Sequence, residues 1–154
     1  MRTSALVVAF GLTLATGGSL VFAHCEIPCG IYGDGERFTA MAEDLVTIEK
    51  SMGKIAELSS APGENFNQLA RWVANKERHA DNLRETLCQY FLAQRIKTPP
   101  TGNVKASQAY TRQLVVLHQM VVTAMKCKQS TDVAHVERFR GLLQEFEGLY
   151  GQKP

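Results

Sequence analysis

The sequence predicts an all-α protein, an antiparallel four-helix bundle preceded by a short N-terminal hook. Three observations predict it: apolar residues recur every three or four positions along four segments, turns rich in Pro, Gly or Ser separate these segments, and a turn with two cysteines precedes the first. We find no strand-like alternation and no internal repeat. Helices joined by short loops favour antiparallel packing of neighbours.

The first two predicted helices cover residues 36–58 and 65–97. Residues 59–63 end the first helix. Asn65 is expected to cap the second, because Gln68 follows three residues later, and the two prolines of residues 98–102 end it. The side chains expected to face the core are Phe38, Met41, Leu45, Ile48, Met52 and Ile55, then Phe66, Leu69, Trp72, Val73, Leu83, Leu87, Tyr90 and Phe91.

The last two predicted helices cover residues 104–128 and 133–150, and residues 130–132 offer a cap for the fourth. Their apolar stripes contain Leu114, Leu117, Val121 and Met125, then Val136, Phe139, Leu142, Leu143 and Phe146. Burying a large apolar side chain stabilises a fold by ~1.5–3 kcal/mol. The bundle at residues 36–150 therefore needs no metal for its stability, which leaves the N-terminal segment free for function.

Length and charge restrict the class of protein. A chain of 154 residues supports one domain with one core. The formal net charge is +2, with 17 Lys and Arg against 15 Asp and Glu, and like charges form no block. These values argue against nucleic-acid binding and against disorder.

The first 23 residues resemble a secretory signal peptide. Arg2 gives a positive start, residues 5–22 carry no charge, and Val21 and Ala23 are small residues at the −3 and −1 positions before His24. We expect cleavage after Ala23, export to the periplasm or the extracellular space, and no membrane attachment afterwards. An uncleaved membrane anchor is the alternative, because the apolar run is about long enough to span a bilayer.

Cleavage would place five metal donors within residues 24–29. They are the new α-amine and imidazole of His24, the backbone amide and thiolate of Cys25, and the thiolate of Cys29, on a turn that contains Pro28. Two nitrogens and two thiolates in one plane suit Ni(II) or Cu(II), whereas zinc prefers a tetrahedron. Two other interpretations stay open: a Cys25–Cys29 disulfide in a structural bundle, and an exported helical copper-handling protein without turnover.

The segment His-Cys-x-x-Pro-Cys-Gly-x-Tyr resembles the nickel hook of the nickel superoxide dismutase family. The matching residues are His24, Cys25, Pro28, Cys29, Gly30 and Tyr32, and residues 76–80 add a looser Lys-Glu-x-x-Ala match. The resemblance implies a nickel ion cofactor bound by His24, Cys25 and Cys29, with a metal hook at 24–32 and one domain at 24–154. It also implies that two superoxide ions become O₂ and H₂O₂ by Ni(III)/Ni(II) cycling, in a homohexamer. Tyr32 would order superoxide or water beside the open axial face.

Residues around the hook depart from the family pattern. Glu26 stands where many members carry Asp. The axial imidazole is usually held by a glutamate on the first helix and an arginine on the second. Here Glu43 is the nearest glutamate, and His79 falls where the arginine is expected, beside Arg78. These four residues are the candidate supports of the metal ligands.

The other two cysteines, Cys88 and Cys127, are expected to be buried free thiols. If the second and third helices form a hairpin about Gly102, Cys88 lies opposite position 116, and Cys127 lies ~16 Å further along. A disulfide requires Cα atoms within ~7 Å of each other.

Overall fold

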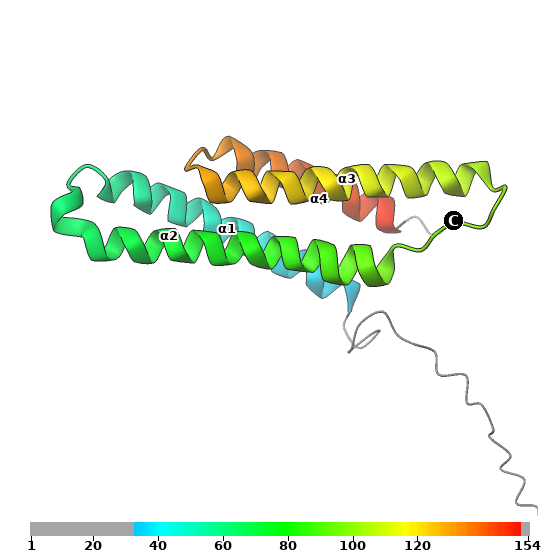
Figure 1. Ribbon diagram of the computed structural model, residues 1–154, viewed down its shortest axis with the longest axis horizontal. Helices are drawn as coiled ribbons and strands as arrows, with labels where there is room; N and C mark the ends of the chain where they lie inside the picture. The colour runs from blue at the N-terminus through cyan, green and yellow to red at the C-terminus, as the bar shows by residue number, and fades with distance from the viewer. Residues whose placement is uncertain (1–32, 152–154) are drawn as a thin grey trace, which may run out of the picture.

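The computed structural model describes residues 33–151, which form an antiparallel bundle of four helical rods (Figure 1). The elements are α1 (Asp34–Leu58), α2 (Pro62–Glu85) continuing directly into η1 (Thr86–Arg95), α3 (Val104–Gln129) and α4 (Ala134–Gly151). Helices α1 and α3 run one way, and α2 and α4 run the other. The predicted fold class is confirmed. The predicted signal peptide at 1–23 and hook at 24–32 lie outside the described residues.

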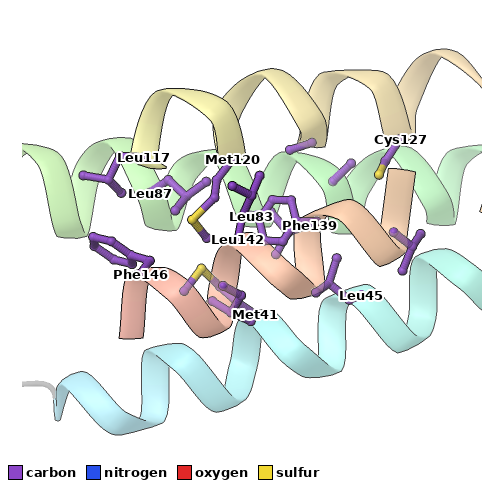
Figure 2. Packing of buried hydrophobic residues seen from close by; sticks show 14 of the residues in the cluster. Met41, Leu45, Leu83, Leu87, Leu117, Met120, Cys127, Phe139, Leu142 and Phe146 are labelled. Carbon is purple, nitrogen blue, oxygen red and sulfur yellow. The ribbon is translucent and has the colours of Figure 1, made fainter. Parts of the chain in front are cut away.

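All four rods contribute to one apolar core. Figure 2 shows it between the rods, with Met41 and Leu45 of α1 facing Leu142 of α4. The fully buried large side chains are Phe91, Phe139, Phe146, Met41, Leu45, Ile48, Met52, Leu83, Leu87, Met120, Leu142 and Val116. Within residues 33–151, no helix is long and apolar enough to cross a membrane.

Three residues predicted to face the core, Phe66, Val73 and Met125, are instead exposed. Phe66 is 76% exposed, because the first turns of α2 project beyond the α3–α4 turn, where α1 lies beside them but α3 and α4 do not reach (Figure 1). Met125 is 43% exposed, since α3 turns the smaller side chains of Ala124 and Cys127 toward the core at this level. The spacing of apolar residues located the helices correctly. It could not show where one helix extends beyond the ends of its neighbours.

The helix starts are only partly as predicted. The predicted Asn65 cap is wrong: α2 begins at Pro62, whose fixed φ suits a first turn, and the Asn65 amide donates to the carbonyl of Ala61. The predicted cap of α4 is confirmed, because Asp132 Oδ1 accepts from the Ala134 N–H at 2.9 Å.

The end of the second rod also differs from the prediction. An α-helix was expected to run to about residue 97, but residues Thr86–Arg95 wind as a π-helix. The N–H of Ile96 closes this segment by donating to the carbonyl of Phe91, five residues earlier, at 2.9 Å. π-Helical segments are rare and are often found at functional sites.

Candidate metal centre and its support in the bundle

The predicted metal ligands precede the bundle. His24, Cys25 and Cys29, together with Tyr32 and Glu26, lie outside the described residues. Within residues 33–151, no group of three or more His, Cys, Asp or Glu side chains is arranged to hold a metal ion. The structure therefore describes the bundle that follows the predicted hook in the sequence.

The bundle begins at Asp34, the first residue of α1 and the second after Tyr32. Its carboxylate accepts hydrogen bonds from the Tyr90 hydroxyl at 2.5 Å, the Tyr150 hydroxyl at 2.8 Å and the Arg95 guanidinium at 2.5 Å. Arg95 Nε also donates to Tyr150 Oη at 3.2 Å. The side chains of Asp34 and Arg95 are 26% and 29% exposed. The start of α1 is thus tied to η1 and to the last turn of α4 by one carboxylate.

The π-helical winding accounts for two of these partners. In an α-helix, residues five positions apart point in directions about 140° apart, because each residue turns the chain by about 100°. Tyr90 and Arg95 are five positions apart, and both reach Asp34. A π-helix, with hydrogen bonds between residues five apart, places such a pair on one face. The Arg95 guanidinium also lies 5.7 Å from the centre of the Tyr90 ring.

Aromatic rings form the floor beneath this cluster. Phe38 of α1 packs 5.0 Å from Phe91, and Phe91 packs edge-on against Phe146 at 5.1 Å and Tyr150 at 5.5 Å, measured between ring centroids. Each such pair adds ~0.5–1.5 kcal/mol beyond its buried area. The phenolic oxygen of Tyr150 is therefore held by its ring as well as by its hydrogen bonds.

The protonation states match these contacts. Burial raises the pKa of Asp34, but hydrogen bonds from Arg95, Tyr90 and Tyr150 outweigh it, and the net pKa lies below the ordinary 3.8. Burial and the bond to Asp34 raise the pKa of Tyr90 to about 12. At neutral pH the cluster therefore contains a carboxylate, a guanidinium and two neutral phenols.

The candidate supports on α1 and α2 are only partly brought together. His79 Nδ1 lies 2.6 Å from Asp44 Oδ1, and the Asn82 amide also donates to that oxygen at 3.3 Å. Glu43 and Arg78 are exposed. The structure thus gives His79 a carboxylate partner on α1 one residue after the position that the sequence suggested.

Lys76 has a role that the sequence did not reveal. It is 4% exposed, and its ammonium donates to the carbonyls of Cys127 at 2.9 Å and Ser130 at 3.0 Å, and to that of Lys128. Three N–H donors thus meet three acceptors at the end of α3, where backbone carbonyls lack helical partners. The only sequence signal was its place in the Lys-Glu-x-x-Ala stretch.

The prediction of free thiols is confirmed, but the predicted burial is confirmed only for Cys127. Cys88 is half-buried and Cys127 is buried, and neither is in a disulfide. Burial raises the pKa of the Cys127 thiol to about 11. This thiol is accordingly protonated and unreactive at neutral pH.

Comparison with known proteins supplies the family. A family model described as nickel-containing superoxide dismutase matches residues 19–153 of the 154-residue chain. The matched range includes the predicted hook at 24–32 as well as the whole bundle. Searches of curated proteins and of solved structures gave no significant match.

Proposed function

The chain belongs to the nickel-containing superoxide dismutase family, and we propose that its residues 24–32 form the nickel hook, with His24, Cys25 and Cys29 as ligands. The family is an oxidoreductase family that uses nickel and acts on superoxide. The observation that carries the proposal is that one family match spans both this motif and the described bundle. The copper-handling alternative predicts copper at the same segment, and the disulfide alternative predicts a Cys25–Cys29 disulfide and no metal.

The donor set fits nickel. Thiolates and an anionic amide are electron-rich and favour a tetragonal metal. Nickel in this set supplies one-electron cycling between Ni(III) and Ni(II). The residues of the chain would then hold the metal through His24, Cys25 and Cys29, and Tyr32 would order superoxide or water by hydrogen bonding.

Metal analysis of the mature chain tests the ligand set. We expect about one nickel per chain and superoxide-scavenging activity, and loss of both in Cys25→Ser and Cys29→Ser. Cys88→Ser is the matched control, because Cys88 lies on η1 and outside the ligand set. Copper without activity would favour the metal-handling alternative. A chain with no metal and no free thiol at the hook would favour the disulfide.

In this proposal, cleavage after Ala23 creates the metal site. Before cleavage the His24 nitrogen is a peptide nitrogen, so the amine ligand does not exist. We expect nickel-loaded chains that retain residues 1–23 to be inactive, and chains that begin at His24 to be active. Equal activity would contradict this step. The same leader predicts an exported enzyme, and N-terminal sequencing of protein recovered outside the cytoplasm tests both points.

We propose that the pair formed by His79 and Asp44 supports the imidazole of His24, one of the residues that would hold nickel. Asp44 lies ten residues into α1, ~15 Å from Asp34. The ten residues between His24 and Asp34 can span up to ~35 Å, so the covalent chain permits this contact. We expect Asp44→Asn to change the nitrogen hyperfine splitting in the electron paramagnetic resonance spectrum, and Glu43→Gln to leave it unchanged. The opposite result would favour the glutamate.

Assembly into a homohexamer is also proposed. The bundle exposes several large apolar side chains, including Phe66 and Val73 of α2. Exposed apolar surface of this kind is often covered by another subunit. Sedimentation of the mature chain should give the mass of six copies, and Phe66→Ser should lower it. A monomeric wild-type chain would refute the assembly.

A further inference from the structure

The proposed metal ligands do not include the carboxylate of Asp34, which lies close to the proposed hook in the sequence. Asp34 is five residues from Cys29 and two from Tyr32, so it stands between the predicted ligands and the rigid bundle. Gly33 precedes it with an extended backbone (φ −73°, ψ 133°) and gives α1 no side-chain cap. The direction in which the chain leaves α1 therefore depends on how firmly the first turn of α1 is held.

The structure holds that turn from two sides. The carboxylate has three donors, two on η1 and one on α4, at 2.5 to 2.8 Å. In addition, the Arg37 guanidinium, on the same turn of α1, lies 5.3 Å from the centre of the Tyr90 ring. Other ion pairs of α1 lie further along: Glu49 binds Arg140 of α4 at 2.6 Å.

The π-helix is further evidence that the first turn of α1 is held by specific contacts. Because the ten residues of η1 depart from α-helical winding, Tyr90 and Arg95 both reach Asp34. Bundle packing alone does not require this, because α2, α3 and α4 pack into the same core with ordinary α-helical winding.

We propose that Asp34, bound by Tyr90, Arg95 and Tyr150, is a positioning residue that fixes the base of the nickel hook and so preorganises its ligands. The proposal rests on the proposed hook at residues 24–32. A metal site gains affinity when the bundle, rather than the metal, has already restricted its ligands. Residues that orient metal ligands typically contribute roughly 10- to 100-fold in affinity or activity.

Asp34→Asn in the mature chain is the test. The substitution keeps the size of the side chain but removes its charge and points an NH₂ group at other donors. We expect Ni(II) affinity, measured by competition with a chelator, to fall roughly 10- to 100-fold. In metal-free protein we expect the amides of residues 35–38 to exchange with solvent faster.

Glu49→Gln is the matched control. It also breaks an ion pair between α1 and another helix, but ~22 Å from Asp34 along α1. We expect this variant to bind nickel as tightly as wild type, with a comparable fall in urea midpoint. Tyr90→Phe keeps the ring packing and removes one donor, so it should lower affinity several-fold even if Asp34→Asn fails to fold.

The outcomes separate the two ideas. If wild type binds nickel and Asp34→Asn, Tyr90→Phe and Glu49→Gln bind it equally well, the positioning role is refuted and the hook stands. If wild type binds no nickel, or binds it equally well in Cys25→Ser and Cys29→Ser, the proposed ligand set and the positioning role fail together.

Discussion

Replacing Lys76 with Met should destabilise the bundle by about 3 kcal/mol. The methionine keeps the apolar stem, so no large cavity forms, but the three carbonyls at the end of α3 lose their donor. Hydrogen bonds to a charged group contribute ~1.5–3 kcal/mol each. The substitution also removes the free-energy cost of burying the ammonium charge, which is several kcal/mol. The difference leaves about 3 kcal/mol, a large part of the stability of an ordinary domain.

Urea unfolding followed by circular dichroism at 222 nm would measure this loss. We expect an unchanged slope and a lower midpoint, with the melting temperature reduced by about 12 °C. The exposed Lys50 of α1 supplies the control, because Lys50→Met removes a lysine with no buried contact. If Lys76→Met unfolds within ~0.5 kcal/mol of Lys50→Met, the three contacts do not stabilise the fold as argued.

Two further predictions concern ionisation. Tyr90 has a folded pKa of about 12 against an ordinary 10, so its contribution to stability is complete below pH 10 and is lost as the pH rises toward 12. Tyr90→Phe should therefore flatten the fall of the urea midpoint between pH 10 and 12, and an unchanged fall would contradict this role of Tyr90. The second prediction uses a chain with the substitutions Cys25→Ser and Cys29→Ser, treated with a thiol reagent at pH 8. Cys88 should be labelled at least tenfold faster than Cys127, because Cys127 is buried and protonated. Equal labelling rates, measured by peptide mapping, would contradict the burial of Cys127.

Much of the fold could be predicted from the sequence because its information is local. The spacing of Met41, Leu45, Ile48 and Met52 marks one helical face without reference to the rest of the chain. The exposure of Phe66 could not be predicted, since it depends on where the α3–α4 turn falls relative to the start of α2.

The contacts of Asp34 with Tyr90, Arg95 and Tyr150 could not be predicted for a related reason. Tyr90 and Arg95 look unrelated on an α-helical wheel, and only π-helical winding makes them neighbours. Asp34 and Tyr150 are 116 residues apart, and no short motif joins them. The predicted ligands of the hook, by contrast, lie within six residues, so their chemistry could be proposed from composition and order alone.

The contact between Asp34 and Tyr150 also has a consequence for biosynthesis. Tyr150 is translated 116 residues after Asp34, and Asp34 lies two residues after the end of the proposed hook. A nascent chain therefore cannot complete the contacts that hold the first turn of α1 until α4 has been made and has docked. If the hook binds nickel as proposed, metal loading would favour chains in which α4 is already folded.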